Sequence, residues 1–249
     1  MLPQLTLQLF GSFGVGLFAG FIGAIAGGGG LISVPFLLFI GIPPQIALAT
    51  SKFGGLGMCF GAAFKFIKEK QVVWKYAVIL SIGGIIASII GSRFLLNSGN
   101  YPLDKIVGVL LLVLVPTIFL KKGFGLKKIK VTPTKKVIGT IIYFLLSILA
   151  SFFGGMGVLM ISSVVYFFGL SIIEANATDI IAYMVLSVTA VIIYMMNSIV
   201  NYPVGIALFC GMLLGGYAGA HTAIKKGNQF VKIIFAIVII ASAIKILIG

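Results

Sequence analysis

Long uncharged apolar runs, separated by short polar segments, cover most of the chain. About 20 consecutive apolar residues are enough for a helix to cross a bilayer. The pattern therefore predicts an all-α, polytopic helical membrane protein. The predicted spans cover residues 5–40, 46–66, 74–96, 103–120, 137–168, 173–196, 202–224 and 231–248.

The first and fifth runs are too long for one helix and too short for two full ones. Each contains glycines that would break a helix: Gly27, Gly28, Gly29 and Gly30 in the first, and Gly154, Gly155 and Gly157 in the fifth. Irregular backbone at membrane depth is tolerated only where protein or a watery cavity satisfies its polar groups. Two breaks at matching positions therefore predict a transporter's binding site near the midplane.

The two halves of the chain align without a gap at an offset of 128 residues, which indicates an internal duplication. Many matches involve small residues, so the unbroken register carries more weight than any single pair. The matching pairs are Gly41 with Gly169, Ala49-Thr50 with Ala177-Thr178, Gly83 with Gly211, and Gly91 with Gly219.

Composition excludes a soluble domain, because 60% of the 249 residues are hydrophobic and 9% are charged. The first run lacks a basic start and a small-residue cleavage site, so we do not expect a removable signal peptide. The formal net charge is +14, but the lysines lie in loops between apolar spans. The positive-inside rule and contact with anionic lipids explain this placement of the lysines. The positive charge therefore does not indicate nucleic-acid binding.

Charge also predicts the orientation of the loops. Loops 65–75, 121–136 and 225–232 are rich in lysine and should be cytoplasmic, whereas loops 97–102 and 197–201 carry no charge and should face outward. Equivalent loops of the two halves therefore fall on opposite sides of the membrane. This pattern predicts inverted repeats: a first repeat over 1–120, a basic cytoplasmic linker over 121–136 and a second repeat over 137–249.

Inversion requires an odd number of crossings in each half. Either the short segments 31–40 and 159–168 cross, giving five, or each forms a re-entrant hairpin with the preceding helix, giving three. We expect five, because residues 5–25 alone are long enough to span the membrane.

The glycine breaks are the first candidate site. Glycine lets a backbone approach a ligand closely, and the exposed N–H groups at a helix start favour an anion. The alternative is that the glycines only allow tight helix packing.

The second candidate is the polar stretch Thr50-Ser51-Lys52 and its mate Thr178-Asp179. The hydroxyls could bind substrate or cap a helix. Lys52 needs a partner at membrane depth, which could be a bound anion, Asp179, Glu174 or the interface. Asp179 is the candidate for proton coupling.

These motifs resemble the TauE/SafE sulfite exporter family, whose members include permeases of the 4-toluene sulfonate uptake type. The resemblance rests on Gly23-Ala24-Ile25-Ala26-Gly27-Gly28-Gly29-Gly30-Leu31-Ile32-Ser33-Val34-Pro35, the following Gly41, and Ala49-Thr50-Ser51-Lys52. It covers nearly the whole chain and implies an inner-membrane transporter of sulfite, sulfonates or related small anions. The second half departs, with Gly155-Met156-Gly157-Val158, Ser163 in place of proline, and an acidic Asp179.

The sequence as a whole favours a secondary transporter of a small anion, with the substrate between the two glycine breaks and alternating access by rocking of the repeats. A passive anion channel or a non-transporting scaffold subunit is the alternative. An enzyme is not expected, because the chain has few carboxylates and lacks the common hydrolase and zinc motifs. No metal or cofactor is predicted, and proton coupling and a homo-oligomer stay open.

Overall fold

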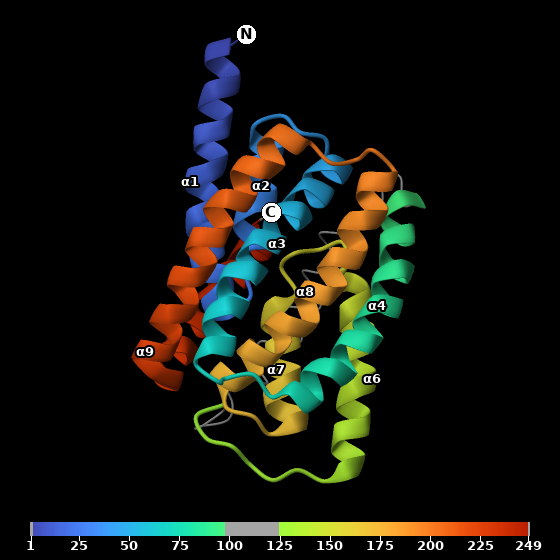
Figure 1. Ribbon diagram of the computed structural model, residues 1–249, viewed down its shortest axis with the longest axis vertical. Coiled ribbons are helices and arrows are strands. Elements are labelled where there is room, and N and C mark those ends of the chain that lie inside the picture. Colours follow the sequence, from blue (N-terminus) through green and yellow to red (C-terminus); the bar gives the residue numbers. More distant parts are fainter. Residues whose placement is uncertain (1, 98–124, 249) are drawn as a thin grey trace.

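The computed structural model describes residues 2–97 and 125–248, and this part of the chain is all-helical. Six of its helices are long and apolar enough to cross a membrane. The predicted span 103–120 and most of the neutral loop 97–102 lie outside the described residues. The helices are α1 (Leu2–Ala26), α2 (Gly30–Phe39), α3 (Pro44–Lys68), α4 (Trp74–Asn97), α6 (Pro133–Ala150), α7 (Gly157–Phe168), α8 (Ile172–Met196) and α9 (Tyr202–Ile248) (Figure 1).

Local chemistry sets the helix ends. Proline occupies the first turn of α3 and of α6, where its missing N–H would have no helical acceptor. Helix α7 ends on Gly169 in the left-handed region (φ 72°), and α8 begins with a capping box between Ser171 and Glu174. Helix α6 therefore starts inside the stretch predicted as linker, and its first residues are helical.

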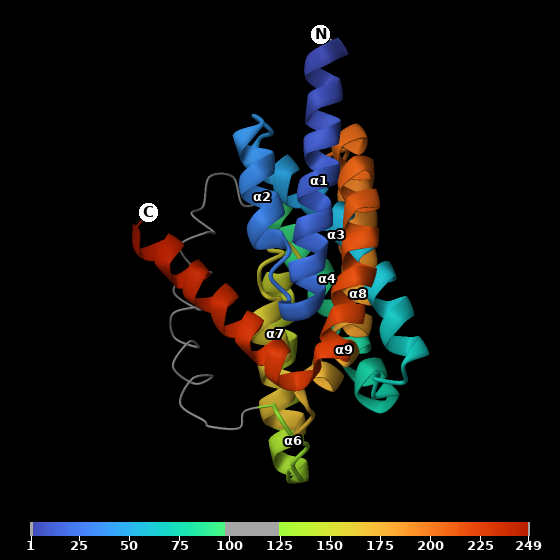
Figure 2. The same ribbon diagram turned by 90° about the vertical axis from the view of Figure 1, so that its left-hand side faces the viewer.

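Both glycine breaks reverse the chain direction. Gly27 has a left-handed φ of 74°, and α2 returns alongside α1 toward the end at which α1 began (Figure 2). Helix α7 likewise returns along α6. We call α1 with α2 the first hairpin and α6 with α7 the second hairpin. Helices α2 and α7 have 10 and 12 residues, which is short for a membrane crossing. A helix that crosses back and a re-entrant helix would both return in this direction, so the expectation of five crossings in each half stays a prediction.

The two halves repeat the same local geometry at the offset of 128 residues. The loop after α3 has Lys70 at φ 54°, and the loop after α8 has Ser198 at φ 55°. In both, the next residue donates its N–H back to the helix, Gln71 to Phe66 O at 3.0 Å and Ile199 to Tyr194 O at 3.2 Å. These equivalent loops lie at opposite ends of the molecule (Figure 1). An inverted duplication predicts this arrangement.

Each hairpin packs on a helix from the other half of the chain. The first hairpin lies against α9 through α1, and the second hairpin lies against α4 through α6. Helices α3 and α8 contact each other at the centre, α3 also packs on α9, and α8 also packs on α4. Each half therefore holds the hairpin of the other half in place.

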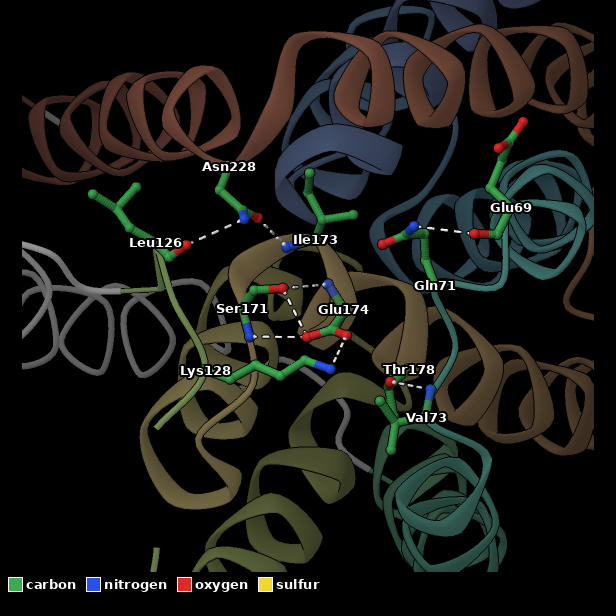
Figure 3. Close-up of polar contacts among 10 residues, drawn as sticks. All are labelled: Glu69, Gln71, Val73, Leu126, Lys128, Ser171, Ile173, Glu174, Thr178 and Asn228. Atoms are coloured by element: carbon green, nitrogen blue, oxygen red, sulfur yellow. Dashed lines mark hydrogen bonds and ion pairs between the residues drawn. The ribbon is translucent and has the colours of Figure 1, made fainter. Parts of the chain in front are cut away.

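The lysine-rich loops meet at one end of the molecule, which we call the basic end. Asn228 follows the bend in α9 at Gly227 (φ 81°); it donates to Leu126 O at 3.3 Å and accepts from Ile173 N–H at 3.1 Å. Val73, from the loop after α3, donates to Thr178 Oγ1 at 3.1 Å. Figure 3 shows these contacts gathered around the start of α8.

Candidate functional site

The tips of the two hairpins touch backbone to backbone near the middle of the molecule. A Cβ added to Gly27 would lie 2.5 Å from the carbonyl carbon of Gly157, and one added to Gly30 would lie 2.4 Å from that of Gly154. Only glycine allows this approach. The two glycine breaks predicted from the sequence are therefore in direct contact with each other.

A small cavity of about 30 Å³ lies beside this contact. That volume is enough for a water-sized group. Glycines from both tips line the cavity, and its charged lining side chains are Lys52 from α3 and Asp179 from α8. At the start of α2, Gly29 and Gly30 belong to the first turn, where N–H groups have no acceptor within the helix.

Lys52 is buried, with 3% of its surface exposed. Its ammonium donates to the carbonyl of Ala150, the last residue of α6, and to Tyr183 Oη at 2.9 Å. The ammonium also lies 4.0 Å from the centre of the Tyr183 ring. These partners differ from those proposed above. The ion pairs of the described residues are Lys65–Glu69 and Lys128–Glu174, so Lys52 is not bonded to Asp179 or Glu174.

Asp179 also lines the cavity and is also 3% exposed. Its Oδ1 accepts a hydrogen bond of 2.7 Å from the hydroxyl of Tyr143 on α6. Helix α6 thus anchors both charged residues, Lys52 through its last carbonyl and Asp179 through Tyr143.

Two further polar groups line or border the cavity. Ser51 Oγ is 2.6 Å from Ser33 Oγ, which ties α3 to α2. Asn176, from α8, donates from Nδ2 to the carbonyls of Ala24 at 2.7 Å and Ile25 at 3.1 Å. It therefore satisfies the carbonyl end of α1 much as Lys52 satisfies that of α6.

Thr50 and Thr178 do not line the cavity. Their hydroxyls accept backbone N–H bonds from equivalent loops of the other half, Thr50 from Asn201 at 3.0 Å and Thr178 from Val73 at 3.1 Å. Each threonine therefore fixes a loop at one end of the molecule.

The structure brings together most of the residues predicted for binding. Lining the cavity are Gly27, Gly29, Gly30, Ser51, Lys52, Gly157 and Asp179, whereas Gly28, Thr50, Gly155 and Thr178 lie outside its lining. Sequence reasoning missed Asn176, Tyr143 and Tyr183. A tyrosine in the middle of an apolar span is unusual, since tyrosine favours the membrane interfaces, and this signal could have marked the latter two.

The basic end carries polar contacts of its own. Glu174 pairs with Lys128 at 2.5 Å, and backbone bonds join Ile129 to Gly169 and Ile172 to Gly125. Glu69 accepts from Lys65 Nζ at 2.8 Å, and this hydrogen bond together with the lysine charge holds the pKa of Glu69 below its usual range. Across residues 2–97 and 125–248, no group of three or more potential metal ligands occurs.

Comparison with known proteins decides the family. The sequence profile of the sulfite exporter TauE/SafE family matches residues 12–246. The chain belongs to this family. The resemblance seen in the glycine and Ala-Thr-Ser-Lys motifs is thereby confirmed.

Relatives of the TauE/SafE protein cover nearly all of its length. A "probable membrane transporter protein" of Haemophilus influenzae is 26% identical over 88% of this chain and 87% of its own. The ORF9 "probable membrane transporter protein" of a Sinorhizobium species is 28% identical over 92% and 88%. YfcA of Escherichia coli, with the same description, is 24% identical over 94% and 88%. No solved structure gives a significant match.

The family, these relatives and the six apolar helices establish a multi-pass membrane transporter rather than an enzyme.

Proposed function

We propose that this TauE/SafE protein is a secondary transporter of a small sulfur-containing or organic anion, bound where the two hairpin tips meet. The observation that carries the proposal is the buried Lys52 beside a cavity lined by glycines of both tips. A lysine and two helix starts supply positive potential in a place that water reaches poorly. Sulfite is the first substrate to test, because the family is described as sulfite exporters.

Alternating access would follow from a relative movement of the two halves. The cavity in this structure has room for a water-sized group, so a larger anion requires the tips to separate. Opening at the basic end would require the Lys128–Glu174 and Asn228 contacts to break. Asp179, which lines the same cavity as Lys52, is the candidate for proton coupling.

The test is uptake of radiolabelled sulfite into proteoliposomes, with and without a pH gradient. We expect saturable flux that falls about tenfold or more in Lys52→Ala and Lys52→Met, since a charge-assisted hydrogen bond contributes about 1.5–3 kcal/mol. Lys75→Ala, which removes an exposed lysine outside the cavity, is the matched control and should transport normally.

Two results would contradict parts of the proposal. Normal flux in both Lys52 variants would show that the anion does not bind beside Lys52. Flux that never saturates and cannot be driven uphill would identify a passive channel.

A further inference from the structure

Asn176, one of the residues that line the cavity, carries a buried acceptor atom that has no donor among the described residues. Asn176 is 1% exposed, and its Oδ1 has no hydrogen-bond partner among the described residues. Its orientation is defined, because Nδ2 faces two carbonyl oxygens, of Ala24 and Ile25, and an oxygen in that place would be repelled. A buried polar atom without a partner is unfavourable, so such an atom in a cavity wall indicates a missing donor.

Asp179 adds acceptor capacity on the same helix. A carboxylate has about four lone-pair positions, and the Tyr143 hydroxyl occupies one of them. Asn176 and Asp179 both line the cavity from α8. This wall therefore offers oxygen acceptors.

Other groups that line the cavity offer donors. Lys52 has three N–H bonds, of which two go to Ala150 O and Tyr183 Oη, and the third has no acceptor within the described part of the chain. The first turn of α2 adds N–H groups at Gly29 and Gly30. The formal charges of Lys52 and Asp179 cancel, so the site as built does not favour an anion with two charges and no hydrogen.

We infer that the site takes a singly charged anion that itself carries a hydrogen-bond donor, such as hydrogensulfite or a hydroxylated sulfonate. The anionic oxygens face Lys52 and the start of α2, and the O–H donates to the acceptor wall of Asn176 and Asp179. This inference rests on the proposed function, and it narrows the substrate class of that same site.

The test compares two sulfonates that differ by one hydroxyl, ethanesulfonate and 2-hydroxyethanesulfonate. Each is used to inhibit exchange of radiolabelled sulfite in proteoliposomes that hold the full chain. We expect the hydroxylated compound to inhibit the wild type at a concentration about tenfold lower or less, because a site built to bond a hydroxyl rejects the analogue without it. Equal inhibition by the two compounds would overturn the inference while leaving the transporter proposal intact.

Variants separate the acceptor from the structural role of Asn176. Asn176→Ala removes the acceptor and should bring the two inhibition constants within about twofold of each other. Asn176→Gln keeps an amide oxygen as acceptor together with both amide donors, and should retain the preference. Asn228→Ala removes an amide that also bridges two backbone groups, but outside the cavity, and should leave the preference unchanged. A preference that survives in Asn176→Ala would overturn the assignment.

A second readout keeps the inference testable if sulfite is not transported, which would count against the proposed function. Thermal stabilisation of the purified full chain by the two sulfonates should then still favour the hydroxylated one. Binding of neither compound, or equal stabilisation, would overturn the inference. Stabilisation by Na⁺ with no preference for the hydroxyl would identify a cation as the partner of Asn176, and would also overturn it.

Discussion

At the scale of single residues, the site depends on glycines whose lack of a side chain is required by contact as well as by conformation. Gly27 combines a left-handed φ of 74° with backbone contact to Gly157. The hairpin tips cannot move apart locally to admit a methyl group without disturbing the cavity between them. Substitution at this contact should therefore cost more than a surface change.

We expect Gly27→Ala to lower the stability of the folded protein by about 2–5 kcal/mol, because the left-handed conformation costs about 1–2 kcal/mol and overpacking about 1–3 kcal/mol. Thermal unfolding in detergent measures this. Gly14→Ala on α1 is the control: a Cβ there meets nothing within 4 Å, and alanine favours a helix. A Gly27→Ala protein as stable as Gly14→Ala would contradict the tip contact.

The residue scale also separates what the sequence could predict at the site from what it could not. The glycines, Ser51, Lys52 and Asp179 were predictable because charge and broken helices are unusual at membrane depth. The partner of Lys52 was not, because it is the backbone carbonyl of Ala150, and residue identity does not mark which carbonyl ends a helix. The orphan acceptor of Asn176 likewise depends on packing between α8 and α1.

At the scale of elements, each central helix holds a loop of the other half by one threonine hydroxyl. Thr50 on α3 and Thr178 on α8 make equivalent bonds, to Asn201 and Val73, at opposite ends of the molecule. Both threonines are fully buried, whereas the loop residues Val73 and Asn201 are partly exposed.

We expect Thr50→Val and Thr178→Val each to destabilise the protein by about 0.5–1.5 kcal/mol, the net contribution of one hydrogen bond. Thr189→Val is a matched control, because its hydroxyl only donates to Val185 O within the same helix. Unfolding curves of the three variants test this. If the Thr189 variant were destabilised as much as the other two, the destabilisation could not be assigned to the bonds with the loops.

Helix lengths bear on the predicted number of crossings, which stays a prediction. Residues 5–25 are long enough to span, and α1 indeed counts among the six candidate spans. What length does not show is the direction of α2, which depends on the left-handed Gly27 and on packing against α1 and α3. The break was predictable from the glycines, whereas the return of the chain required the three-dimensional contacts.

At the scale of the whole molecule, the arrangement of loops predicts sidedness. The lysine-rich loops gather at the basic end (Figure 3), and the loop after α8 lies at the other end of the molecule (Figure 1). The positive-inside rule places the basic end in the cytoplasm.

We expect a cysteine placed at Ser198 to react with a membrane-impermeant thiol reagent in intact cells, and one placed at Lys127 to react only after the cells are opened. The native cysteines should first be removed, because Cys210 is exposed. Reaction of both positions from the same side would contradict the predicted orientation of these two loops.

The exchange of hairpins between halves has a consequence for the order in which the protein can be completed. Helix α1 is synthesised before α9, yet α9 is its main packing partner. During synthesis the first hairpin therefore has to stay in the membrane without that partner until α9 is made. In this interval lipid or an insertion factor has to cover the face of α1 that later packs on α9, and the synthesis of α9 completes the packing around the first hairpin.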